Sequence, residues 1–84
     1  MEKTIGRVTH YFDHVHAAAV KLDEPLRVGE TIHVVGHSTD VTATVDRMQV
    51  DHTDVTSAKP GDDVAIHVPD KVREHDEVRK ILPG

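Results

Sequence analysis

The sequence predicts a small all-β domain. Apolar and polar residues alternate in six short runs with a period of two, which is the pattern of half-buried strands. Turns that combine glycine with an acidic residue stand before several of these runs. No segment carries a sustained helical pattern. A flat sheet of six strands would leave two long edges unpaired, so we expect the strands to close into a barrel filled by side chains. An open sandwich is the alternative.

The first run extends from Thr4 to His10 and continues into Tyr11 and Phe12. Ile5 and Val8 differ in parity and Gly6 lies between them, which predicts a β-bulge at this glycine. The second run extends from Val15 to Leu22. Its three alanines would also suit a helix, but eight residues are few for a helix and valines flank the alanines, so a strand is favoured.

The remaining runs are Thr31–Gly36, Val41–Val50, Asp63–Val68 and Val78–Leu82, the last stopping at Pro83-Gly84. In the long run Val41–Val50 the apolar parity changes, so we expect a bend or bulge near Asp46. Asp51–Lys59 is polar and is interpreted as a loop or a single helical turn. The predicted interior consists of Ile5, Val8, Val20, Leu22, Ile32, Val34, Val45, Met48, Val50, Val64, Ile66, Val68 and Val78.

One turn pattern recurs three times, in Val28–Ile32, Pro60–Val64 and Glu74–Val78. In each copy an acidic residue follows the turn position and an apolar residue stands two places further on. The turn position is glycine in the first two copies and His75 in the third. Glycine supplies the positive φ of a type II turn, and the acid can accept hydrogen bonds from backbone N–H groups at the strand entrance.

With these turns, four stretches resemble the translation-factor β-barrel: Ile5–Phe12, Leu26–Ile32, Val45–Val50 and Ala58–Ile66. The resemblance runs from about Thr4 to Lys80. It is similar to the second domain of elongation factor Tu, and the closest likeness is to the C-terminal barrel of collagenase-like peptidases, which are linked to RNA modification. The resemblance implies a closed six-stranded antiparallel Greek-key barrel, and the whole chain, 1–84, is expected to form this one domain.

The resemblance also implies a function. We expect a non-catalytic binding module that engages RNA, the ribosome or a translation-related protein. An adapter that binds protein beside a collagenase-like enzyme is the first alternative. The chain carries neither the phosphate-binding loop of a GTPase nor a peptidase catalytic domain, so GTP hydrolysis and proteolysis are not expected to transfer.

Composition restricts the function classes further. The 84 residues carry ten Lys and Arg against fifteen Asp and Glu, a net charge of −5, which disfavours strong non-specific nucleic-acid binding. Cysteine is absent, which excludes disulfides and thiolate chemistry. No apolar run approaches a membrane span, and the N-terminus does not resemble a signal peptide, so a cytoplasmic protein without membrane contact is expected.

Eight histidines are the most unusual feature of the composition. On a strand, His14 and His16 would share one face, with His10 just across a short connection. Imidazoles in this arrangement can bind zinc or nickel, so a histidine metal site is the second alternative function. Solvent-exposed histidines at the barrel rim explain the same pattern without a metal, and no cofactor is predicted.

No set of residues indicates catalysis, and the protein is not expected to be an enzyme. His37 and Ser38 are adjacent, so on a strand their side chains would point to opposite faces and could not act as a catalytic pair. Basic residues offer a strip for phosphate contacts on an otherwise acidic surface. The predicted strip consists of Arg7, Lys21, Lys71, Arg73, Arg79 and Lys80.

Overall fold

The computed structural model describes residues 1–83, and within that range the chain forms strands and turns but no helix. The all-β prediction is confirmed, and every strand pair is antiparallel. Ten strands are present instead of the six predicted. They are β1 (Glu2–Phe12), β2 (Ala17–Leu22), β3 (Leu26–Arg27), β4 (Thr31–Val35), β5 (Asp40–Thr44), β6 (Met48–Val50), β7 (Thr53–Val55), β8 (Ser57–Ala58), β9 (Asp63–His67) and β10 (Glu77–Ile81).

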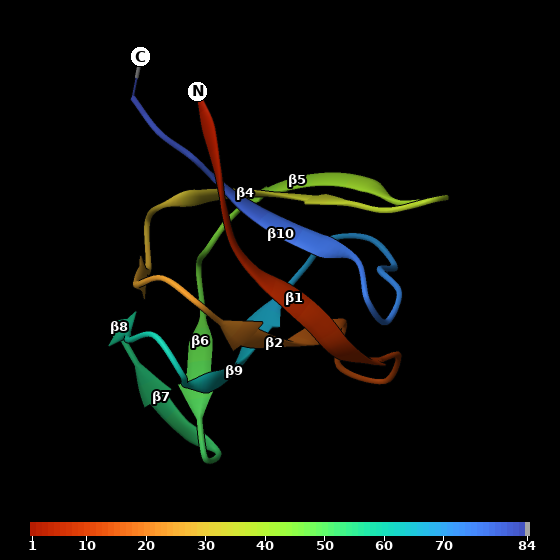
Figure 1. The fold of residues 1–84 in the computed structure, drawn as a ribbon. Coiled ribbons are helices and arrows are strands. Elements are labelled where there is room, and N and C mark those ends of the chain that lie inside the picture. Colours follow the sequence, from red (N-terminus) through yellow and green to blue (C-terminus); the bar gives the residue numbers. More distant parts are fainter. Residues whose placement is uncertain (84) are drawn as a thin grey trace.

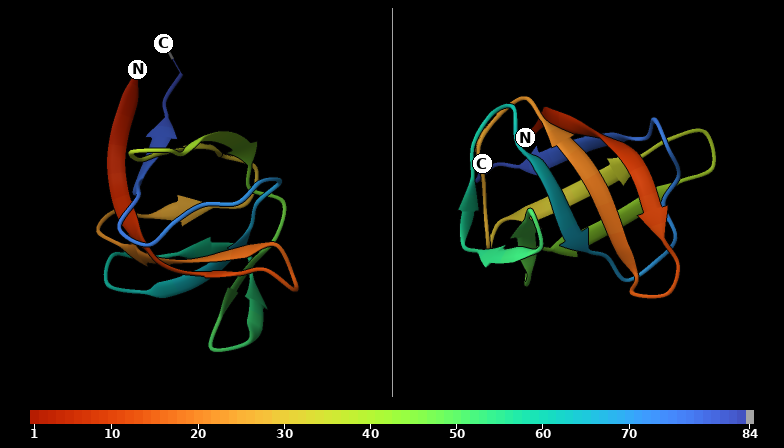
Figure 2. Two further views of the ribbon diagram at one scale, coloured as in Figure 1. Left: turned by 90° about the vertical axis from the view of Figure 1, so that its right-hand side faces the viewer. Right: turned by 90° about the horizontal axis from the view of Figure 1, so that it is seen from below.

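Eight strands form one curled sheet in the order β5-β4-β10-β1-β2-β9-β6-β7, and β3 pairs with β8 in a small ribbon (Figures 1 and 2). The predicted closed barrel is not seen among residues 1–83, because the edge strands β5 and β7 do not pair with each other. The backbone links the two ends of the curled sheet instead. The edge strand β5 continues through Val45–Arg47 into β6, which lies next to the other edge strand, β7. The Greek-key arrangement stays a prediction.

Two irregularities bend β1, the longest strand. Its register shifts between Thr4 and Gly6 against β10, which confirms the predicted bulge, and again between Val8 and His10 against β2. The first shift lets both Ile5 and Val8 point into the core, where both are fully buried. Gly6 is needed for space, because a Cβ there would lie 2.4 Å from the carbonyl oxygen of Lys21.

The second half of the chain departs most from prediction. The run Val41–Val50 is interrupted at Val45–Arg47, as the predicted bend near Asp46 required, and becomes two strands. Asp51–Lys59 is neither a loop nor a helical turn, because it contains β7 and β8. Asp51 and His52 form a tight two-residue hairpin, both with positive φ (52° and 62°). Such hairpins ordinarily use asparagine and glycine, so Asp51-His52 is not a recognisable hairpin turn in the sequence.

The core fills the inside of the curl. Of the thirteen residues predicted to be interior, all but Val50 are buried, and Val50 is half-buried against the core. Ala18, Leu26, Val41, Ala58 and Val72 are buried in addition. Leu26 and Ala58 are paired in the β3–β8 ribbon, and both side chains are buried. The ribbon therefore contributes to the hydrophobic core.

The three recurring turns have one geometry, and the prediction about their acids is confirmed. Gly29, Gly61 and His75 have φ of 98°, 93° and 73°. In each turn the acid side chain accepts a hydrogen bond from the backbone N–H three residues earlier. The three bonds are Arg27 N to Glu30 Oε1 at 2.7 Å, Lys59 N to Asp62 Oδ2 at 3.0 Å and Arg73 N to Asp76 Oδ2 at 2.8 Å. The same kind of side-chain hydrogen bond therefore stabilises the turn before each of β4, β9 and β10.

Candidate functional site

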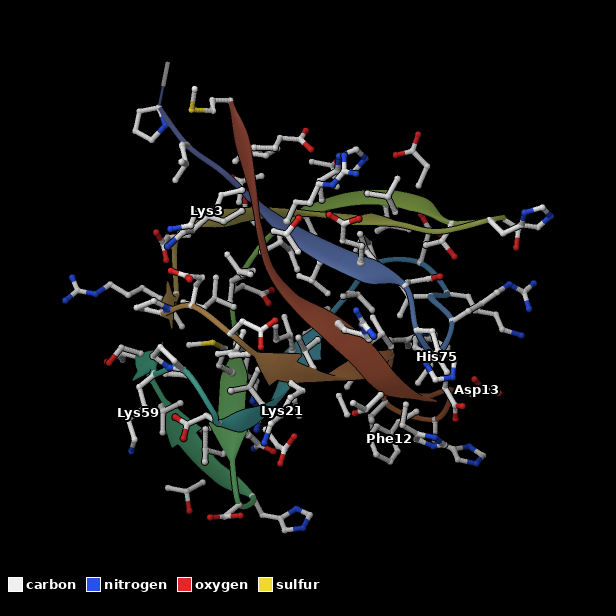
Figure 3. The ribbon with its side chains drawn as sticks, in the orientation of Figure 1. Lys3, Phe12, Asp13, Lys21, Lys59 and His75 are labelled. Atoms are coloured by element: carbon white, nitrogen blue, oxygen red, sulfur yellow. The ribbon has the colours of Figure 1, made fainter. Side chains whose placement is uncertain are left out.

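Two of the six predicted basic residues meet on the outer surface. Arg7 on β1 and Lys21 on β2 are cross-strand partners, and both line a hollow of about 580 Å³ together with Val8, Thr9, Asp23 and His75. His75 reaches this place because its backbone N–H donates to the carbonyl of Val8, at 2.8 Å. Figure 3 labels Lys21 on β2 and His75 on the loop before β10. The hollow thus combines side chains from three separate segments.

Arg7 and Lys21 lie in a row of four outward charges. The register pairs Glu77 with Arg7, Arg7 with Lys21, and Lys21 with Asp63, so two cations stand between two carboxylates on β10, β1, β2 and β9. Lys21 Nζ donates to the carbonyl of Gly61 at 3.0 Å and lies 3.8 Å from Asp63 Oδ2. In the described part of the chain the Arg7 guanidinium has neither a hydrogen bond nor an ion pair.

Arg79 belongs to a different polar cluster, on the face of β5, β4, β10 and β1. Its Nε donates to Glu77 Oε2 at 2.9 Å, and its Nη1 lies 3.5 Å from Glu2 Oε1. Glu77 also accepts a hydrogen bond from the hydroxyl of Thr4. These contacts, that of Arg79 first, lower the pKa of the Glu77 carboxyl. Arg79 is therefore occupied by internal carboxylates and does not line the hollow, although Glu77 lies between it and Arg7.

His33 is the centre of the same cluster. Its Nε2 lies 2.5 Å from Asp40 Oδ1 and its Nδ1 lies 3.0 Å from Glu2 Oε1. Both ring nitrogens therefore face a carboxylate, which favours the doubly protonated ring. The hydrogen bond with Asp40, followed by that with Glu2, raises the pKa of His33, and the His33 bond lowers the pKa of Glu2.

The other predicted basic residues do not complete a strip. Lys80 lies on the opposite face of β10 from Arg79, because successive strand residues alternate in direction. Its Nζ donates to the carbonyl of Pro25 at 3.0 Å and lies 3.3 Å from Glu30 Oε2. Lys71 and Arg73 are exposed on the segment between β9 and β10 and do not line the hollow. Of the predicted strip, only Arg7 and Lys21 are brought together at one site.

The proposed metal site rested on a strand that is not there. Residues 13–16 form the turn between β1 and β2, so His14 and His16 do not share a strand face. His10 packs edge-on against Phe12, with ring centroids 4.5 Å apart, and its Nδ1 lies 3.6 Å from Glu74 Oε1. Within residues 1–83, no three His, Cys, Asp or Glu side chains come together in a group that could hold a metal ion.

Left-handed turns account for three of the eight histidines. His16, His52 and His75 all have positive φ (51°, 62° and 73°). Histidine enters this region more readily than most residues, although glycine and asparagine are preferred. These three histidines therefore occupy three separate turns and do not form one set of metal ligands.

A second surface feature was not predicted from the sequence. A groove of about 470 Å³ crosses the outer face of β2, β9 and β6. Its lining consists of Val15, Ala17, Asp46, Arg47, Gln49, Ala65 and His67. Val15 is 63% exposed, and Phe12, at the other side of the same hairpin, is 44% exposed. The outward alanines of the second strand were the available clue, because small side chains on a wet sheet face leave room for a neighbour.

Polar pairs border this groove. His67 Nδ1 lies 3.4 Å from Asp46 Oδ1. Asp54, on β7, accepts hydrogen bonds from Gln49 Nε2 at 2.9 Å and from Arg47 Nε at 3.3 Å, and these two contacts lower its pKa. The groove thus combines small apolar lining residues with charged residues at its border.

Comparison with known proteins identifies a relative in sequence. No protein-family model matches the chain. Over 75 residues it is 39% identical to the protein named "uncharacterized protease MJ0090" of Methanocaldococcus jannaschii. The match covers 88% of this chain but only 18% of that protein, so the chain spans about a fifth of the length of this relative.

Solved structures with the same fold come from Geobacillus thermoleovorans. The C-terminal domain of a protein named as a U32 peptidase superposes with a TM-score of 0.88 at 18% identity, over 95% of this chain and 93% of that domain. Its selenomethionine variant gives a TM-score of 0.87, over 93% of this chain and 99% of that one. The fold is thus that of a U32 peptidase C-terminal domain. The link to translation-factor barrels stays a prediction, as do partners drawn from RNA, the ribosome or translation proteins.

Within residues 1–83 we find no helix that could span a membrane.

Proposed function

We propose that the chain is a non-catalytic binding domain that works together with a catalytic domain of the U32 peptidase kind. The observation that carries this proposal is the 39% identity to a segment that makes up 18% of a protein named as a protease. The fold likeness to the C-terminal domain of a protein named as a U32 peptidase points in the same direction. This is the adapter function that the sequence analysis held as an alternative.

The groove over β2, β9 and β6 is the surface best suited to the contact. Its floor offers Val15 and two alanines, Ala17 and Ala65, and its rim offers paired charges that can exchange partners. Phe12 extends the apolar surface at the tip of the hairpin. Interfaces within and between chains combine such apolar centres with polar rims.

Binding in trans tests the proposal. The M. jannaschii protein is prepared without its matched 75-residue segment, and this chain is titrated into it by isothermal calorimetry. We expect saturable one-to-one binding. Val15→Asp, which places a charge in the apolar floor, weakens binding by about tenfold or more. Val28→Asp is the matched control, since Val28 is an exposed valine in the turn before β4 and does not line the groove.

The relative's own segment serves as the reference partner. If that segment rebinds to the truncated protein and this chain does not, the proposal is wrong for this chain. If both bind but Val15→Asp and Val28→Asp behave alike, binding uses another surface and the groove is excluded. Enzymatic turnover by the chain alone would contradict its non-catalytic role.

A further inference from the structure

Two energetically unfavourable features, a pair of like charges and a left-handed backbone conformation, lie at the hollow beside β1 and β2. Arg7 and Lys21 stand directly opposite each other, an arrangement of like charges that destabilises an antiparallel pair. His75 adopts a φ of 73° where the two equivalent turns use Gly29 and Gly61. Local departures of this kind concentrate at functional sites, where a ligand or partner compensates for them.

Internal contacts compensate for these departures only in part. Lys21 Nζ donates to the carbonyl of Gly61 and has Asp63 at 3.8 Å. Glu77 on β10, the cross-strand partner of Arg7, directs its carboxylate to Arg79 and Thr4, and the nearby Arg7 charge contributes to its lowered pKa. The side chains of Arg7 and His75 make neither a hydrogen bond nor an ion pair within residues 1–83. The side-chain donors of Arg7 and His75 are therefore available to a bound group, while Lys21 keeps its contact with Gly61.

We propose that this hollow binds an oxyanion of the phosphate class. The planar guanidinium of Arg7 offers parallel N–H donors that match two phosphate oxygens. Lys21 supplies a second positive charge, and the imidazole of His75 keeps one N–H donor even when neutral. The volume of about 580 Å³ leaves room for a phosphate together with the group that carries it.

Asp23, on the lining of the same hollow, opposes the anion. Its carboxylate sets a limit on affinity and selects against bulky, highly charged ligands that reach it. The same residue gives the proposal a gain-of-function test, because removing its charge favours any anion bound beside it.

The shared chemistry is a phosphate group, which belongs equally to a nucleic-acid backbone and to a small phosphorylated molecule. The net charge of −5 makes general attraction of nucleic acid weak, so any binding depends on this local site. The site shares no lining residue with the groove over β2, β9 and β6. Phosphate binding and the proposed binding of a U32-type catalytic domain can therefore be tested independently.

Nuclear magnetic resonance titration tests the site directly. Inorganic phosphate is added to the ¹⁵N-labelled chain at constant ionic strength, and a short single-stranded RNA is added in a parallel experiment. We expect saturable shifts centred on Arg7, Lys21 and His75. Arg7→Gln and Lys21→Gln each weaken binding by about tenfold. Lys59→Gln is the matched control, because Lys59 is an exposed lysine away from the hollow.

Asp23→Asn is expected to tighten phosphate binding several-fold. RNA binding that Arg7→Gln abolishes supports a backbone phosphodiester as the natural ligand, whereas binding of inorganic phosphate without RNA supports a small phosphorylated molecule. Shifts that spread over all basic residues, or that Lys59→Gln reduces as much as Arg7→Gln does, overturn the proposal. So does the absence of saturable shifts with either probe.

Discussion

The carboxylate of Asp76 lies against the backbone of Gly36, and a Cβ at position 36 would come within 1.9 Å of Asp76 Oδ1. The same carboxylate accepts the hydrogen bond from Arg73 N at 2.8 Å, and Asp76 is only 6% exposed. The turn before β10 therefore packs directly on the hairpin between β4 and β5. Glycine is needed at position 36 for space.

Gly36→Ala is expected to lower the free energy of unfolding by about 1–3 kcal/mol, the usual cost of forcing extra atoms into a packed site. The new methyl group displaces the Asp76 carboxylate and breaks its bond to Arg73 N. Urea unfolding monitored by circular dichroism gives the value.

A double-mutant cycle identifies the cause. Asp76→Ala removes all three atoms that the methyl group would meet, so Gly36→Ala costs much less in that background. If the two substitutions are additive, the collision with Asp76 is not the reason for the loss.

His75→Gly is expected to stabilise the fold by about 0.5–1 kcal/mol, because glycine adopts the φ of 73° without the steric cost that a Cβ brings. Thermal unfolding measures it, and 1 kcal/mol corresponds to about 4–8 °C in a domain of this size. The same substitution removes a donor from the proposed phosphate site, so stability and anion affinity are expected to change in opposite directions.

Gly61→Ala is the reverse experiment. A Cβ at Gly61 meets no atom within 4 Å, so the substitution tests backbone strain at a φ of 93° and nothing else. We expect a loss of about 1 kcal/mol. A neutral result at both turns would show that positive φ is not costly in these turns.

Replacing the turn acids is expected to destabilise the protein in order of burial. Asp76→Ala leaves the Arg73 N–H without its acceptor in a buried place and costs about 1.5–3 kcal/mol. Asp62→Ala costs less, about 0.5–1.5 kcal/mol, because Lys59 N can turn to water. Asp62→Asn keeps an acceptor oxygen and serves as the control. Chemical unfolding of the three variants ranks them, and equal losses for Asp62→Ala and Asp62→Asn would exclude the hydrogen bond as the cause.

Alternation and turn chemistry were sufficient to predict most of the fold. Three local features were predicted directly, because each depends on residues that are close in sequence. They are the bulge at Gly6, the bend near Asp46 and the turns with an acidic side chain. Strands β7 and β8 were not predicted, because they are only two or three residues long and largely polar. Whether the edge strands β5 and β7 pair depends on the curvature of the whole sheet, which cannot be predicted from a local sequence pattern.

The candidate site was predictable only where strand pairing is local. Arg7 and Lys21 belong to one hairpin, so their meeting followed from the sequence. His75 joins them through a backbone contact with Val8, 67 residues earlier in the chain, which sequence spacing does not indicate. Arg79 and Lys80 are neighbours in sequence but occupy opposite faces of β10, so the two side chains do not lie on one surface.

His33 makes the stability depend on pH in a defined direction. Its folded-state pKa is raised above the ordinary 6.5, first by Asp40 and then by Glu2. The stabilisation is therefore fully present below pH 6.5 and is lost as the pH rises through the folded-state pKa. The pKa of Glu2 is lowered below 4.5, so its contribution is present above pH 4.5 and is lost as the pH falls through its folded-state value.

We therefore expect the free energy of unfolding to fall as the pH rises above 6.5, and to fall less in His33→Gln, whose amide keeps hydrogen bonds but does not titrate. Chemical unfolding across this range measures both proteins. Their difference isolates His33 from the other histidines, and the imidazole proton resonance of His33 reports its titration directly. A midpoint at or below 6.5, or parallel stability profiles for the two proteins, would show that the two carboxylates do not hold the ring in its charged form.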